Sequence, residues 1–146
     1  MTPSGRAALI ASIKGHEGTG PMKHGRFFLY QDTVGKWTGG WGHNFTDKGM
    51  SPAVVDLLLN EDIDEAVRAA AGYPWFVDLD EVRQAIIAEM IFNIGSFGFS
   101  TFKRLIHSMA TKNYTQAATQ MRQSLWAAQV KGRAETLAKR METGKD

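Results

Sequence analysis

Two carboxylic acids in the N-terminal third of the sequence have the types and the setting that acid–base chemistry requires. Glu17 stands at the end of a segment with helical spacing, directly before a glycine, and Asp32 stands at the start of a turn between two aromatic segments. On opposite sides of a cleft, such a pair could cleave a glycosidic bond, one protonated acid donating to the leaving oxygen and one ionised carboxylate serving on the other face. Each also has a simpler interpretation, because Glu17 could balance a helix end and Asp32 could form a turn.

The elements that would position these acids are a short helix and a small sheet. The apolar spacing in Ser4–His16 predicts an amphipathic helix that ends at Glu17, and a glycine-rich loop follows through Pro21 and Gly25. Arg26–Gln31 and Lys36–Gly42 are aromatic, strand-like segments joined by a turn. They predict a small antiparallel sheet.

The remainder of the chain is predicted to be helical. Ser51-Pro52 supplies an N-cap and a proline at the first helical position, and that helix should end near Gly72-Tyr73-Pro74. The apolar segment Asp80–Ile94 predicts the central helix, which Gly95–Phe99 should break. Further helices are expected at Thr101–Met109, Tyr114–Met121 and Gly132–Met141. The fold class is therefore α+β, with a small antiparallel β lobe inserted after the first helix and packed on a helical C-terminal lobe.

Length and composition indicate one globular domain. The chain has 146 residues, 43% of them hydrophobic and 22% charged, which suffices for a core of its own and excludes a disordered or fibrous chain. Ten of the fifteen glycines lie between Gly5 and Gly49 and mark two lobes. We expect a single domain over residues 1–146, with a β lobe at about 18–46 and a helical lobe at about 51–146 that includes the N-terminal helix 4–16.

The net charge of +2 conceals an uneven distribution. From Lys103 to the end there are nine Lys and Arg against three Asp and Glu, a balance of +6, so the first 102 residues sum to −4. A basic C-terminal face could meet nucleic acid, a membrane surface or an acidic cell-wall polymer, or it could be a solvated helical face. Nucleic acid is disfavoured because the basic residues are not interleaved with exposed aromatic ones.

Several chemistries and locations are excluded by composition. The chain has no cysteine, so disulfides, thiolate zinc sites and a thiol nucleophile are ruled out. His16, His24 and His107 lack partners at ligand spacing, and we expect no metal and no cofactor. The apolar runs are too short to span a bilayer, and Ala7–Ile13 is too weak for a secretory signal. We therefore expect no membrane anchor.

The residues around the two acids resemble the signature of the phage-type lysozymes, glycoside hydrolase family 24. In that family a Glu-Gly pair after the first helix is followed by the pattern Tyr-x-Asp-x-x-Gly-x-x-Thr-x-Gly-x-Gly-His, which Glu17-Gly18 and Tyr30–His43 match. The resemblance continues through Leu59–Val67, Leu79–Gly95, Phe102, Ser124-x-Trp126 and Gly132-Arg133-Ala134. Residues 18–31 form a longer connection than the family has, which we interpret as a loop insertion around Thr19–Gly25. The β lobe is otherwise reduced.

The resemblance implies a catalytic set. It makes Glu17 the general acid. Asp32 and Thr38 would position the attacking water, and Asp32 would also be the base. The reaction would be an inverting hydrolysis of the β-1,4 bond between N-acetylmuramic acid and N-acetylglucosamine. It also implies a salt bridge between His43 and Asp62 across the lobes, where the alternative for His43 is a base or a metal ligand. Arg133 matches a family arginine that reaches the catalytic glutamate.

The resemblance also implies substrate-binding positions. Asn44, Phe92, Asn93 and Gln120 match cleft-lining positions, although Phe92 could instead be a core residue. Among the four tryptophans, Trp41 is best placed to stack on a sugar, whereas Trp75 and Trp126 are expected in the core.

The biological setting that the resemblance implies is a phage endolysin. It would act as a monomer on bacterial peptidoglycan, leaving the host cytoplasm for the periplasm through holin-dependent export without a signal peptide of its own. The alternative is a noncatalytic or virion-associated peptidoglycan-binding protein with the same fold.

Overall fold

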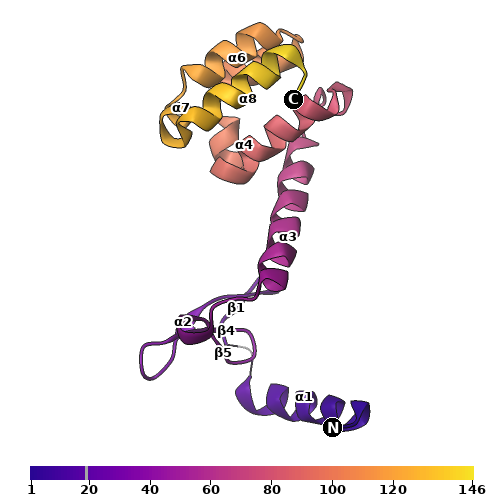
Figure 1. Cartoon of the computed structure of the whole chain (residues 1–146), viewed down its shortest axis with the longest axis vertical. Coiled ribbons are helices and arrows are strands. Elements are labelled where there is room, and N and C mark those ends of the chain that lie inside the picture. Colours follow the sequence, from indigo (N-terminus) through magenta and orange to yellow (C-terminus); the bar gives the residue numbers. More distant parts are fainter. Residues whose placement is uncertain (19) are drawn as a thin grey trace. The chain divides into compact units, whose positions relative to one another are not determined.

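Helix α3 (Pro52–Ala70) runs across the boundary between two compact units of the computed structural model, Met1–Val55 and Asp56–Asp146 (Figure 1). The structure describes residues 1–18 and 20–146. Its many helices and small antiparallel sheets confirm the predicted α+β class. The N-terminal helix α1 (Pro3–Glu17) falls within the first unit. The single domain over residues 1–146 and the assignment of residues 4–16 to the helical lobe stay predictions.

Helix α1 confirms the element expected at Ser4–His16 and is one residue longer at each end. Thr2 caps it, because its hydroxyl oxygen accepts a hydrogen bond from the Gly5 N–H at 3.2 Å, and Pro3 begins the first turn. Gly18 ends it with a positive φ of 65°. Glu17 is thereby fixed as the last helical residue, at the point where the chain turns toward the strands.

The strands of the first unit are shorter and more numerous than predicted. A hairpin pairs β1 (Met22–Lys23) with β2 (Arg26–Phe27), and a separate antiparallel sheet has the order β3 (Tyr30–Gln31), β4 (Trp37–Gly39), β5 (His43–Asn44). Helix α2 (Phe45–Lys48) follows directly.

Two sequence predictions about these strands were wrong in extent. The segment 26–31, expected to be one strand, is divided between the two sheets, with Phe28 and Leu29 between them. The segment 36–42 forms a strand only as far as Gly39, because Gly40 and Gly42 adopt positive φ angles of 58° and 83° and turn the chain into β5. The expected loop at 19–25 contains β1, and its first residue, Thr19, lies outside the described residues.

The second unit is helical, and the helices that follow α3 gather into one group in Figure 1. The expected helices are confirmed with small shifts of their ends, and two short elements, η1 and α7, were not predicted. After α3 the elements are η1 (Phe76–Asp78), α4 (Glu81–Ser100), α5 (Lys103–Ala110), α6 (Tyr114–Arg122), α7 (Leu125–Val130) and α8 (Gly132–Thr143). The break predicted at Gly95 is a kink, since Gly95 has a φ of 75° and helical structure resumes as far as Ser100.

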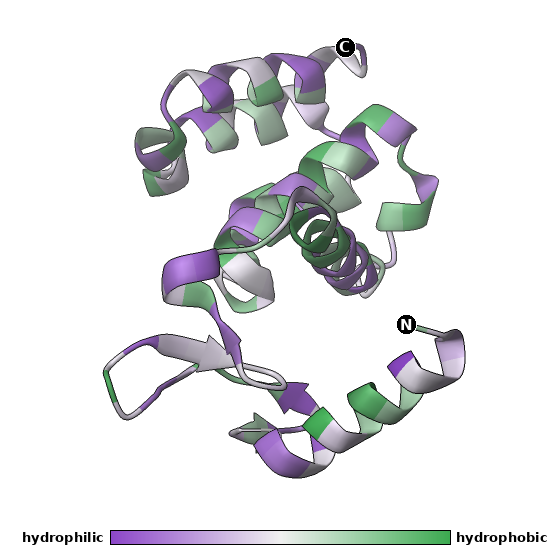
Figure 2. Ribbon diagram, turned by 60° about the horizontal axis from the view of Figure 1, so that its bottom comes forward, coloured by the Kyte–Doolittle hydropathy of each residue, from purple (hydrophilic) through white to green (hydrophobic). Residues whose placement is uncertain are grey.

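The core of the second unit is built mainly from α4, α5, α6 and α8. Apolar and polar residues alternate along these helices, as Figure 2 shows in green and purple. The fully buried large side chains are Ile86, Ile87, Met90, Phe99, Leu105, Met109, Met121 and Met141. Among the described residues no single helix is long and apolar enough to cross a membrane, and α4 and α5 meet that criterion only as a pair bent by 105°.

Arg83 fastens the end of α8 to the start of α4. Its guanidinium donates from Nε to the carbonyl of Met141 at 2.8 Å and from Nη2 to that of Glu142 at 3.0 Å. It also lies 3.7 Å from the centroid of the Tyr114 ring and pairs with Asp80, which caps α4. The arginine thus donates hydrogen bonds to carbonyls at the C-terminal end of a helix, which have no partner within the helix.

Candidate active site

The side chain of Glu17 lies against the glycine turn between β4 and β5. A Cβ placed on Gly42 would be 3.1 Å from Glu17 Oε2, which is tighter than an ordinary contact. Gly42 therefore has two reasons to be glycine, its φ of 83° and the carboxylate beside it. The last residue of α1 and the end of the Tyr30–His43 motif are brought together in this way.

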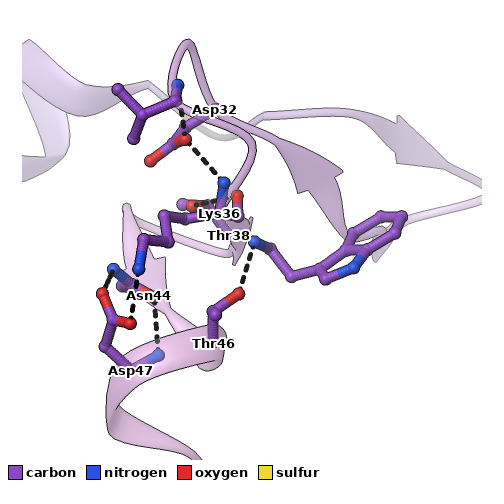
Figure 3. Close-up of polar contacts among 8 residues, drawn as sticks. Asp32, Lys36, Thr38, Asn44, Thr46 and Asp47 are labelled. Atoms are coloured by element: carbon purple, nitrogen blue, oxygen red, sulfur yellow. Dashed lines mark hydrogen bonds and ion pairs between the residues drawn. The ribbon is translucent and has the colours of Figure 1, made fainter.

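Asp32 is fixed by a turn of its own making. Its Oδ1 accepts hydrogen bonds from the N–H groups of Val34 at 3.0 Å and Lys36 at 2.8 Å, and its own N–H donates to the Lys36 carbonyl at 2.9 Å (Figure 3). This is the side-chain-stabilised turn that aspartate favours. Both of these hydrogen bonds to the carboxylate are made to Oδ1.

Thr38 lies in the middle strand of the three-stranded sheet, opposite Tyr30 on β3 and Asn44 on β5, and is only 6% exposed. Its hydroxyl donates to the Lys36 carbonyl at 3.2 Å, and the hydroxyl oxygen retains the capacity to accept. Asp32 and Thr38 are thus both bound to Lys36, the first through its N–H and carbonyl and the second through its carbonyl. Lys36 thus links the turn of Asp32 to the strand that carries Thr38.

Asp47 supports this turn and was not identified from the sequence. Its Oδ1 lies 2.7 Å from the Lys36 Nζ, and its Oδ2 accepts from the Asn44 Nδ2 at 2.9 Å (Figure 3). The Lys36 ammonium first, and Asn44 second, hold the pKa of Asp47 below its usual range. The signal in the sequence was the spacing Asn44-x-x-Asp47, since Asn44 caps α2 by accepting from the Asp47 N–H at 3.0 Å.

The other site residues expected in the first unit have defined contacts. His43 Nε2 lies 2.8 Å from the carbonyl oxygen of Gly49, and its ring meets that of Phe45 edge-on at 4.7 Å. Trp41 is 38% exposed, meets Phe27 edge-on at 5.8 Å and has the Lys14 ammonium 5.0 Å from its centroid. The side-chain amide of Asn44 is hydrogen-bonded to Asp47 through both its nitrogen and its oxygen.

The site residues expected in the second unit are partly exposed and partly structural. Phe92 is 46% exposed, not a core residue, and lines two cavities on α3 and α4 of about 300 and 490 Å³, the first with Asp62 and the second with Arg133. Asn93 accepts from the Trp126 indole at 3.0 Å. Gln120 accepts from the Ser108 hydroxyl at 3.2 Å.

Two of the residues expected to connect the two units, His43 and Arg133, have partners within their own units. Arg133 Nε lies 3.6 Å from Glu89 Oε1. A pair between His43 and Asp62, and a contact of Arg133 with Glu17, would join the two units and stay predictions.

Two predictions about tryptophan are confirmed. Trp126 is 2% exposed and Trp75 packs against the core with its ring stacked on Tyr73. In the part of the chain that the structure describes, no three His, Cys, Asp or Glu side chains are grouped so as to hold a metal ion.

Comparison with known proteins defines the class. The model of the phage lysozyme family matches residues 23–143, and the chain belongs to this family. Two relatives from Dictyostelium discoideum, probable T4-type lysozymes 1 and 2, are 25% and 23% identical over 146 residues, covering 80% of this chain and 86% of each relative. The family match contains Asp32 and Thr38 and begins after Glu17. Family membership supports a lysozyme, or muramidase, function with peptidoglycan as the substrate.

Proposed function

We propose that this protein is an endolysin-type muramidase that hydrolyses the β-1,4 bond between N-acetylmuramic acid and N-acetylglucosamine with inversion. Glu17 is the general acid, and Asp32 with Thr38 positions the water. The proposal includes release from the host cytoplasm for lysis, for which the support is the family resemblance alone.

The observation that carries the proposal is the contact between Glu17 and Gly42. It joins a carboxylate that precedes the family match to the glycine turn that lies within it. Glycine at positions 40 and 42 leaves backbone open to a close-lying ligand. An acid at such an opening, in the same unit as a second acid and a buried hydroxyl, is suited to glycoside hydrolysis.

The proposed reaction balances without any further group. Glu17 donates its proton to the glycosidic oxygen as the bond from that oxygen to the anomeric carbon breaks. A water held between Asp32 Oδ2 and the Thr38 hydroxyl attacks the anomeric carbon from the opposite face and gives its proton to Asp32. An inverting enzyme needs carboxyl groups roughly 6.5–9.5 Å apart to admit that water.

The test is lysis of permeabilised Gram-negative cells, followed by turbidity, with Glu17→Gln beside the unchanged protein. A carboxamide cannot deliver a proton, so lysis should be abolished. Glu61→Gln, on the exposed surface of α3, is the matched control and should lyse normally. Full lysis by a folded Glu17→Gln variant would refute the assignment. Binding to cell walls without lysis by the unchanged protein would instead support the noncatalytic alternative.

A further inference from the structure

A cavity of about 540 Å³ opens on the first unit beside the proposed acid. One wall is the glycine turn that runs from Gly39 to Gly42, and Gly42 is also the residue against which Glu17 lies. Aromatic and apolar side chains supply the other walls: Phe27, Phe28, Leu29, Trp41 and Phe45. Gly42 therefore lies both in the wall of the cavity and against the side chain of Glu17.

The aromatic rings of this cavity are open to solvent. Phe27, Phe28 and Trp41 are 44%, 45% and 38% exposed. Three large rings left half in water around one hollow, two of them in edge-on contact, form a surface that is suited to a ligand with a flat apolar face. A pyranose ring has such a face, made by its axial C–H groups, and polar groups around its rim.

Phe27 and Phe28 come from the longer connection between Glu17 and Asp32. The hairpin of β1 and β2 fixes them, since Met22 pairs with Phe27 and the Phe28 N–H donates to the Pro21 carbonyl at 2.9 Å. This hairpin thus holds Phe27 and Phe28 in the wall of the cavity, next to the family motif.

Basic side chains border the same aromatic surface. The Lys23 ammonium lies 5.8 Å from the Phe28 centroid, and Lys48 lines the cavity. No Asp or Glu is among the described residues that line it. A ligand that combines a sugar ring with a carboxylate would satisfy both features, because the rings contact the sugar and the ammonium groups attract the anion.

We infer that Phe27 and Phe28, which the β1–β2 hairpin holds in place, form with Trp41 a sugar subsite that binds one N-acetylhexosamine ring of a peptidoglycan glycan strand beside Glu17. This inference rests on the proposed function, since it names where the same substrate is held. It makes Phe27 and Phe28 substrate-binding residues.

Binding can be separated from hydrolysis in a Glu17→Gln background. The probes are chitohexaose and glycan strands freed of peptide, with affinity measured by calorimetry. Phe27→Leu and Phe28→Leu should each weaken binding about threefold to tenfold, because each removes an aromatic contact while keeping apolar volume. Trp37→Leu is the matched control, since Trp37 is 49% exposed on β4 and does not line the cavity.

Two further readouts keep a folding defect from imitating the result. The indole N–H resonance of Trp41 should shift on titration with chitohexaose while that of Trp37 stays in place. In the Glu17-containing protein, Phe28→Leu should raise KM for peptidoglycan with kcat nearly unchanged.

The inference is overturned if both phenylalanine variants bind as tightly as their parent, or if Trp37→Leu weakens binding equally. It is also overturned if sedimentation shows dimers that Phe27→Leu dissociates, because the surface would then be a contact between two copies. Failure of the proposed function looks different: the unchanged protein would not cleave peptidoglycan, whatever its affinity for glycan.

Discussion

The buried indole of Trp126 donates its N–H to Asn93 Oδ1 at 3.0 Å, so a side chain from the kinked helix α4 supports the core beneath α7. Asn93 is itself exposed, which leaves its remaining amide hydrogens to solvent or to substrate. The predicted substrate-binding residue Asn93 thus has a structural contact, and a loss of activity on changing it would not by itself show substrate contact.

A double-mutant cycle separates these functions. Asn93→Ala should lower the free energy of unfolding by about 1–3 kcal/mol, because it leaves the buried indole N–H unpaired. In a Trp126→Phe background the same change should cost clearly less. Urea unfolding of the four proteins gives the coupling. Equal costs in both backgrounds would mean that the hydrogen bond contributes nothing to stability.

The contact between Glu17 and Gly42 predicts a strong effect of one methyl group. Gly42→Ala should cost about 1–2 kcal/mol of stability for the positive φ and should also displace the Glu17 carboxylate. Gly25→Ala is the control, since Gly25 has a φ of 75° and open space around it. Both variants should lose stability in thermal unfolding, and only Gly42→Ala should lose most of its lytic rate. Similar rates in the two variants would contradict the positioning of Glu17 at this turn.

Asp47 is predicted to act at a distance through Lys36. Asp47→Asn removes the anionic partner of the Lys36 ammonium and should reduce lysis several-fold, with larger chemical-shift changes at the Lys36 amide than at the Thr46 amide. Asp56→Asn, an exposed change on α3, should leave both readouts as they are. Normal lysis by Asp47→Asn would show that the turn of Asp32 holds without this support.

The pair of Asp80 and Arg83 predicts a pH dependence of stability. Partial burial raises the pKa of Asp80, but the backbone and side-chain hydrogen bonds of Arg83 outweigh it and hold that pKa below its usual value. The stabilisation is therefore complete above the pKa of the unfolded chain, about 3.9, and is lost as the pH falls through the lower folded value. Because the carboxylate is partly exposed, its size is about 1 kcal/mol or less.

Asp80→Asn tests this dependence, because asparagine still caps a helix but cannot pair with Arg83 as an anion. The variant should be less stable than the unchanged protein at pH 7, and the two should converge near pH 2, measured as free energies of unfolding in urea. A difference that persists unchanged at low pH would assign the effect to the cap alone.

The sequence was sufficient for the elements that have strong local signals. The proline after Ser51 marked the start of α3, and the apolar residues of Asp80–Ile94 identified α4 and the centre of the core. Asp32 was placed in a turn because aspartate and the following glycine favour one, and the structure shows that turn with both backbone hydrogen bonds made.

What the sequence could not supply depends on pairings between distant residues. The segment 26–31 has uniform strand propensity, and only its pairing partners divide it between two sheets. Helix α7 is too short for a periodic signal. The spacing Asn44-x-x-Asp47 indicates a helix cap, but the contact of Asp47 with Lys36, eleven residues earlier, cannot be read from it.

The link from Arg83 to the end of α8 has a consequence for how the chain is synthesised. Arg83 reaches a carbonyl 58 residues later, and Met141 is fully buried in the same core. While residues around Met141 are still inside the ribosomal tunnel, the helical unit lacks both that side chain and the partner of Arg83. Its cooperative folding must therefore wait until translation has passed Glu142, whereas the hairpins of the first unit, whose partners are close in sequence, can form as they emerge.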